Sequence, residues 1–107
     1  MKRYIRLLIL VVAILALGYV ITEEVVPRLT QQWIMHQIDE ANYCSVASDC
    51  VDAGGKCPFG CYNYVNAVEV ERISGLLDNY ESECVYGCVR CPQAACIDGS
   101  CVPKCDN

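Results

Sequence analysis

The chain opens with a long run of apolar positions. Residues 7–21 contain fifteen positions without a charged or strongly polar side chain, and Ile5 extends the apolar stretch to seventeen because Arg6 can direct its charge to the lipid head groups. A helix of this length just reaches across the hydrocarbon core of a bilayer. We therefore predict a transmembrane helix, a signal anchor, over residues 5–22, which places this segment in contact with lipid.

Charged residues flank the apolar run with opposite signs. Lys2, Arg3 and Arg6 lie before or at its start, and Glu23 and Glu24 end it. Basic flanks stay in the cytoplasm. The pattern predicts a cytoplasmic basic segment over residues 1–6, with everything after the helix outside, in the periplasm or at the cell surface.

A cleaved signal peptide is the alternative. An apolar region over residues 7–15 followed by Ala16-Leu17-Gly18 has small residues where a signal peptidase cuts. The apolar run nevertheless continues through residues 19–21, which favours a retained anchor. Cleavage would make the protein secreted, and both interpretations export everything after Thr22.

A helical connector without cysteine is predicted over residues 23–42. Pro27 fits the first turn of a helix, where its missing N–H costs nothing, and a weak apolar stripe follows it: Val26, Leu29, Trp33, Ile34, Ile38 and Ala41. We interpret the connector as a stalk, with a packing or self-association helix as the alternative. His36 is expected to be a solvated stalk residue rather than a metal ligand.

The remaining residues, 43–107, predict one small domain with a central helix. Asn66 is a good N-cap, and Glu69 completes a pair resembling a capping box. An apolar face follows at helical spacing: Val70, Ile73, Leu76, Leu77 and Tyr80. Short strands are expected near residues 50–53, and Asp98-Gly99 predicts a tight hairpin turn.

Cysteine dominates this domain. All ten cysteines of the 107-residue chain follow residue 43, their number is even, and the domain is too poor in aliphatic residues to fold easily without cross-links. Exported small domains of this kind are built on disulfides. The fold class is therefore a small disulfide-rich α+β domain, in which we expect every cysteine to be oxidised: Cys44, Cys50, Cys57, Cys61, Cys84, Cys88, Cys91, Cys96, Cys101 and Cys105.

Other cysteine chemistries fit less well. Cys57, Cys61, Cys88 and Cys91 would provide four zinc thiolates, and Cys88 with Cys91 forms a lone C-x-x-C redox spacing. The spacing from Cys84 to Cys91 also matches an iron–sulfur motif of radical enzymes that require a large barrel. Export disfavours zinc and the iron–sulfur cluster, and the C-x-x-C has no βαβ pattern around it and is followed directly by Pro92. The domain has no histidine for a catalytic dyad. We expect no catalytic residue, metal or cofactor.

Charge and aromatic residues narrow the class of partner. The net charge of −5 arises in the cysteine-rich part, which argues against nucleic acid and against anionic lipid surfaces. Tyr62 and Tyr64 are expected to fill gaps in a core short of aliphatic side chains. The alternative is an exposed Tyr62/Tyr64 patch that binds another protein.

The cysteine spacing resembles a known family. The pattern C-x5-C-x6-C-P-x-G-C, then Asn66 at a helix start, then C-I-D-G-S-C, resembles small exported prokaryotic eight-cysteine-cluster domains of unknown function. The resemblance covers about sixty residues and implies a fold and a location, but no active site. It would make Cys88 and Cys105 the two additional cysteines. The start of the domain also faintly resembles whey-acidic-protein inhibitors, which have an adjacent Cys-Cys pair that is missing here.

The expected function is a non-enzymatic binding or surface-interaction module. One alternative is a small protease-inhibitor-like protein, which needs an exposed rigid loop such as residues 51–56. Another is a thiol–disulfide exchange or metal-binding protein.

Overall fold

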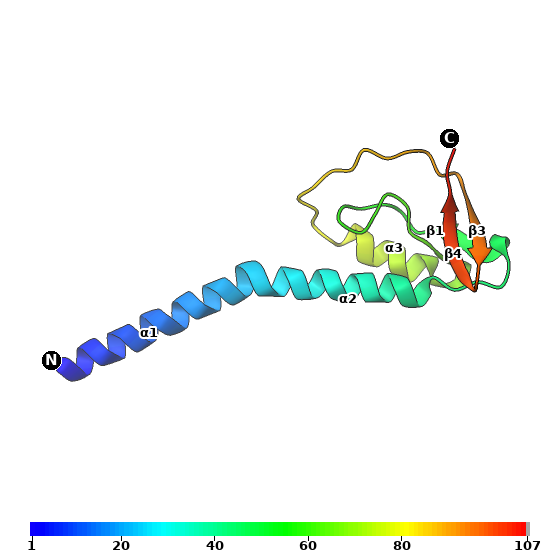
Figure 1. The fold of residues 1–107 in the computed structure, drawn as a ribbon. Coiled ribbons are helices and arrows are strands. Elements are labelled where there is room, and N and C mark those ends of the chain that lie inside the picture. Colours follow the sequence, from blue (N-terminus) through cyan, green and yellow to red (C-terminus); the bar gives the residue numbers. More distant parts are fainter. Residues whose placement is uncertain (107) are drawn as a thin grey trace. The chain divides into compact units, whose positions relative to one another are not determined.

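The computed structural model describes residues 1–106 and divides into two compact units, which meet between Trp33 and Ile34. The first unit is helical. It contains α1 (Lys2–Val20), a π-helical turn (Ile21–Val25) and the start of α2 (Val26–Ala41) (Figure 1). The second unit begins inside α2 and contains all the cysteines.

Helix α1 buries none of its residues. The continuous helical stretch Lys2–Ala41 is long and apolar enough to cross a membrane, with a mean hydropathy of 2.6 in its most apolar window. A membrane anchor and a signal sequence both have these properties. The apolar N-terminal helix expected from the sequence is therefore present.

The π-helical turn lies directly before Pro27. In a regular α-helix the proline ring would clash with the carbonyl four residues earlier and would leave that carbonyl without a donor. Here the N–H of Val26 bonds the carbonyl of Ile21, the wider spacing of a π turn, which loosens the backbone at this point. Pro27 thus occupies the first turn of α2, as expected, although no break in the helix precedes it.

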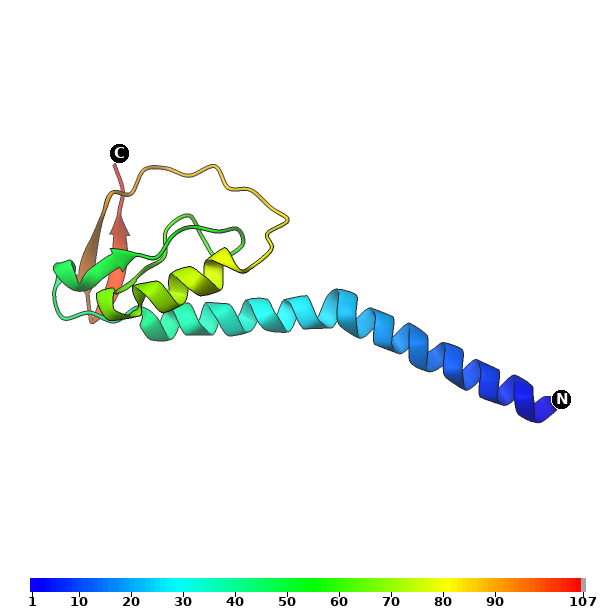
Figure 2. The same ribbon diagram turned by 180° about the vertical axis from the view of Figure 1, so that it is seen from behind.

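The second unit combines short helices with two separate pairs of antiparallel strands. After the end of α2, its elements are a 3-10 turn (Ala47–Asp49), β1 (Cys50–Asp52), β2 (Tyr64–Asn66), a 3-10 turn (Ala67–Glu69), α3 (Val70–Asp78), β3 (Gln93–Ile97) and β4 (Ser100–Lys104). Figure 2 shows α3 beside the end of α2. The β3–β4 hairpin lies toward the start of α3, and the loop of residues 79–92 leaves the other end of this helix.

The hairpin follows from its turn residues. Asp98 and Gly99 have φ values of 51° and 78°, the left-handed conformation that a two-residue turn needs at both positions. This turn sets the register in which Cys96 lies directly opposite Cys101. The predicted tight turn is confirmed, as is a strand beginning at Cys50.

Helix α3 begins much as the sequence indicates. The side chain of Asn66 accepts a hydrogen bond from the N–H of Val68 at 3.2 Å. Glu69 instead bonds Arg72 at 3.0 Å, so its carboxylate supports the first turn from the other side. Ile73 and Leu77 are buried, while Val70, Leu76 and Tyr80 pack around them, as the apolar spacing predicts.

The end of α2 belongs to the domain core. Ile34 and Ala41 are 3% and 0% exposed and cluster with Ala53, Val65, Ile73 and Leu77. Gln37 also accepts a hydrogen bond from Arg72 at 2.7 Å. The compact unit therefore starts at Ile34, and residues 34–41 of the expected connector pack against the domain, which agrees with the packing-helix alternative. His36 is exposed and pairs with Glu40 at 3.1 Å.

This packing predicts that Ile34→Ala destabilises the domain. Loss of the buried side chain and the cavity left behind should cost about 2–5 kcal/mol. The matched control is Met35→Ala at the next position, which is 46% exposed and should change stability by no more than about 0.5 kcal/mol. Denaturant titration of the full chain in micelles, followed by near-ultraviolet circular dichroism, measures both. Equal effects of the two substitutions would contradict the assignment of Ile34 to the core.

Candidate functional site

Disulfides connect the parts of the second unit. The five bridges are Cys44–Cys96, Cys50–Cys101, Cys57–Cys84, Cys61–Cys88 and Cys91–Cys105. No cysteine is free in the described chain, and the expected disulfide-rich domain is present. Cysteines that are close in sequence, such as Cys57 and Cys61, are not partners.

Two bridges hold the β3–β4 hairpin. They end on Cys96 and Cys101, which face each other across the hairpin, and each spans about fifty residues. The sulfur atoms of Cys44, Cys50 and Cys101 lie within 4.8 Å of one another. These sulfurs already form two disulfides, so their proximity reflects adjacent bridges rather than a set of metal ligands.

The side chain of Asn42 supports the same junction. Its amide group pairs with both backbone groups of Cys101, donating to the carbonyl at 3.0 Å and accepting from the N–H at 2.9 Å. It also donates to the carbonyl of Tyr64 at 2.6 Å. Asn42, the residue that follows α2, therefore joins β2 to β4.

Two further bridges join the loop before α3 to the chain after it. Cys57–Cys84 and Cys61–Cys88 each have a sequence separation of 27, so the two linked segments run in the same direction. The four cysteines proposed for zinc are divided among three bridges. Cys88 and Cys105, which were expected to be the two cysteines added to an eight-cysteine pattern, are not bonded to each other. The pair Cys91–Cys105 is a disulfide that an eight-cysteine pattern could lack.

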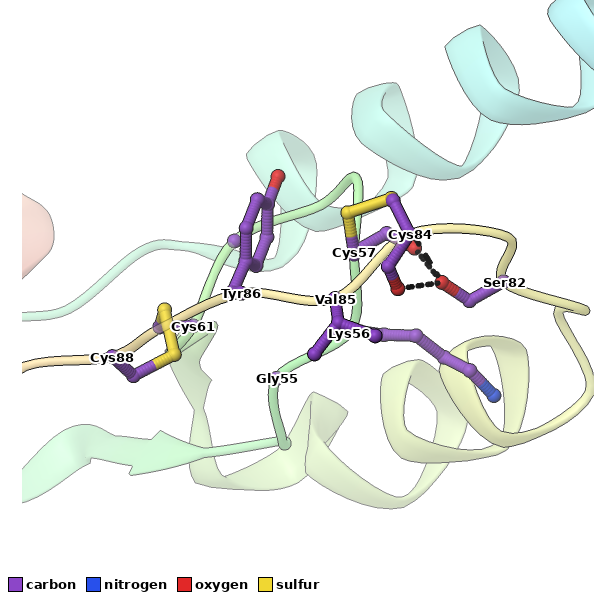
Figure 3. Close-up of a pocket in the computed structure, with 10 residues that line it drawn as sticks. Gly55, Lys56, Cys57, Cys61, Ser82, Cys84, Val85, Tyr86 and Cys88 are labelled. Atoms are coloured by element: carbon purple, nitrogen blue, oxygen red, sulfur yellow. Dashed lines mark hydrogen bonds between the residues drawn. A yellow bond between two sulfur atoms is a disulfide. The ribbon is translucent and has the colours of Figure 1, made fainter.

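The chain between Cys84 and Cys88 lies within a continuous run of exposed residues. We call residues 84–88 the clamped segment, because a disulfide holds each end (Figure 3). From Glu81 to Pro92 the backbone has no helix, strand, turn or bend, and every residue from Glu81 to Arg90 is exposed. The segment is thus extended and solvent-facing but fixed at two points.

Side chains alternate along the clamped segment. Cys84 and Cys88 point toward the loop that carries their partners, and Tyr86, between them, retains 42% exposure. Val85 is 94% exposed, the highest value among the large hydrophobic residues of the domain, and Val89 is 68% exposed. The bridged cysteines and Tyr86 therefore alternate in sequence with Val85 and Gly87, and Val85 is the most exposed of the large apolar side chains there.

The backbone of the clamped segment has no strand partner. Ser82 donates to the carbonyls of Cys57 and Cys84, at 2.6 and 3.1 Å, which steadies the entry to the segment. Among the described residues, no hydrogen bond involves the N–H or C=O groups of residues 85–88. An exposed row of unpaired backbone groups is a template for pairing with another chain.

A cavity of about 320 Å³ lies under the clamped segment. The loop of residues 55–61 and the chain of residues 82–88 form its walls, and the two disulfides close the gap between them (Figure 3). Lys56 lines it and donates to the carbonyl of Asp78 at 3.4 Å. The loop itself is folded back by a hydrogen bond from the N–H of Lys56 to Gly60 at 3.0 Å.

Tyr64 fills the core of the domain, and Tyr62 packs against it. Tyr64 is only 7% exposed, and its hydroxyl donates to the carbonyl of Cys91 at 2.7 Å. Burial raises the pKa of Tyr64, with smaller contributions from the nearby charges of Asp52 and Tyr62. Tyr62 stacks on Tyr64 with ring centres 6.4 Å apart. An exposed Tyr62/Tyr64 patch is therefore wrong for Tyr64, which fills the core.

The loop of residues 51–56 is not free either. Its polar groups are used within the domain: Asp52 accepts from the N–H of Asn63 at 3.1 Å, and Asn63 donates to the carbonyl of Gly54 at 2.8 Å. Ser74 of α3 donates to the carbonyl of Ala53 at 2.9 Å. Residues 84–88 are exposed along their whole length and are cross-linked at each end. The equal spacing of Cys57/Cys61 and Cys84/Cys88 was the signal in the sequence that could have located this segment.

In comparisons with known proteins, no family model, curated protein or solved structure matches the chain. The resemblance to eight-cysteine-cluster domains therefore depends on cysteine spacing alone.

The tight fold of the loop of residues 55–61 predicts opposite effects of alanine at Gly55, within this loop, and at Gly75, within α3. A Cβ at Gly55 would overlap the carbonyl of Cys61, whereas a Cβ at Gly75 in α3 meets nothing within 4 Å. Gly55→Ala should destabilise the domain by more than about 1 kcal/mol. Gly75→Ala should stabilise it by about 0.5–1 kcal/mol, because alanine favours a helix. Thermal unfolding with disulfides intact measures both, and a neutral Gly55→Ala would show that the loop can move away.

Proposed function

We propose that this chain is a single-pass membrane protein whose disulfide-rich domain lies outside the cytoplasm and binds another protein through the clamped segment. The observation that carries the proposal is the combination found at residues 84–88. The backbone there is extended, unpaired and exposed, yet a disulfide fixes it at each end. A segment that is already ordered loses little conformational entropy on binding, and so retains more of its interaction energy as affinity.

Two features support the membrane location. The helix over residues 5–22 is apolar and unburied, and basic residues precede it. All ten cysteines are oxidised, which is typical of an exported domain. We place residues 1–6 in the cytoplasm and the domain in the periplasm or at the cell surface. Cleavage at Ala16-Leu17-Gly18 would release the same domain as a secreted protein.

A binding role agrees better with the side chains than a catalytic one does. Each cysteine is bonded to another cysteine, so none is a free thiolate nucleophile or a free zinc ligand. His36, the single histidine, is exposed and pairs with Glu40. Kinship with eight-cysteine-cluster domains is part of this proposal, supported by the spacing around Asn66.

Lysine labelling tests the topology. In cells with an intact cytoplasmic membrane, an impermeant amine reagent should label Lys56 and Lys104 but leave Lys2 unlabelled until the membrane is opened. Peptide mass spectrometry quantifies each site. Labelling of Lys2 together with protection of both domain lysines would reverse the orientation and remove the basis for the exported domain.

Photocrosslinking tests the binding role of the clamped segment. A photoreactive amino acid at Val85 should crosslink to another protein in the native host. The matched control is Val68, which is 80% exposed but lies in the 3-10 turn before α3. Crosslinks that are equally frequent from both positions would indicate that exposure alone, and not the clamped segment, produces them.

A further inference from the structure

We infer that the partner of the clamped segment is an extracytoplasmic endopeptidase, and that the segment occupies its substrate cleft as a strand with Val85 in the specificity pocket. This inference rests on the proposed function, because it assigns the partner of the same segment. The chain would then act as an inhibitor of that endopeptidase.

The first argument is the state of the backbone. Strand addition uses the main-chain N–H and C=O groups for affinity and the alternate side chains for specificity. Residues 85–88 leave these groups without partners in the described chain, and the absence of a turn or bend from Glu81 to Pro92 keeps them extended. A peptide-binding cleft can therefore pair with them without first unfolding anything.

The second argument is the side chain that the segment presents. Val85 is 94% exposed, whereas its neighbour Cys84 is bonded to Cys57 and Tyr86 retains 42% exposure. A branched aliphatic side chain suits the small specificity pocket of an elastase-type enzyme, and not the acidic pocket of a trypsin-type enzyme. Gly87, further along the segment, has no side chain to obstruct a cleft wall.

The third argument concerns what happens if the enzyme cuts. Hydrolysis of the Val85–Tyr86 peptide bond adds one water and produces a carboxyl group on Val85 and an amino group on Tyr86. Both new ends stay attached to the domain, since Cys84 remains bonded to Cys57 and Cys88 to Cys61. The ends are held at high effective concentration, so the products leave slowly and the reverse reaction, which releases the same water, competes. A segment of this kind blocks a cleft instead of passing through it.

The length of the segment favours a cleft over the edge of another protein's sheet. Only three residues lie between the two clamped cysteines, whereas typical strands pair over about five or six residues. A substrate cleft reads a short extended stretch around one bond. If the segment instead pairs with the sheet edge of another protein, that result contradicts the endopeptidase inference.

The experiment uses the full chain in detergent micelles, with disulfides intact, against three serine endopeptidases that prefer small aliphatic, basic and aromatic residues. We expect the wild-type chain to inhibit the enzyme with aliphatic preference. Val85→Arg should weaken that inhibition by about 100-fold and create inhibition of the enzyme with basic preference, because the pocket reads this side chain. Val68→Arg is the matched control and should change neither. Disulfide mapping by peptide mass spectrometry, with the same five pairs found in each variant, verifies that it has folded.

Two results would overturn the inference. One is rapid turnover of the chain at Val85–Tyr86 with no inhibition, and the other is inhibition that Val85→Arg leaves unchanged. If position 85 still crosslinks to a protein that is not a peptidase, such as one pairing through a sheet edge, the proposed binding function stands and the endopeptidase inference falls. If position 85 forms no crosslink either, both fall.

Discussion

The small size of the apolar core is the constraint on which the rest of this domain depends. Its main cluster has six buried residues, and only Ile73 and Val65 among them are large and fully buried. Such a core excludes too little apolar surface from water to fix the chain by itself. The five disulfides supply what it lacks. Two of them join the hairpin to the start of the domain across about fifty residues, where a cross-link restricts the unfolded chain most in the entropy model.

The same constraint explains why α2 extends into the domain. Ile34, Ile38 and Ala41 provide apolar surface that the cysteine-rich part does not contain. Asn42 then follows directly and bonds both β2 and β4, so the end of the helix places a polar bridge where the two strand pairs meet. The helix is therefore both part of the core and the point from which the hairpin is positioned.

Local signals made part of this structure predictable from sequence. Asp98-Gly99 and Asn66 determine a turn and a helix start through their own backbone and side-chain preferences, and the α3 face follows from periodicity. The packing of Ile34 was harder to predict because Thr30 and Gln37 interrupt the stripe, and its partners Ala53 and Val65 are distant in sequence. Ten cysteines allow about nine hundred complete disulfide pairings, and the sequence does not choose among them. The sequence could not decide whether Tyr64 is buried or exposed. Its hydroxyl donates a hydrogen bond to the carbonyl of Cys91, a contact that only the tertiary fold creates.

The division of labour along residues 84–88 has a consequence for how the sequence can change. Cys84 and Cys88 are committed to bridges, while Val85, Gly87 and Val89 are exposed. Substitutions there alter what the surface presents without altering how the chain folds. The domain is in this respect a scaffold with an interchangeable recognition strand, in which new specificities can arise, or be grafted, at almost no cost in stability.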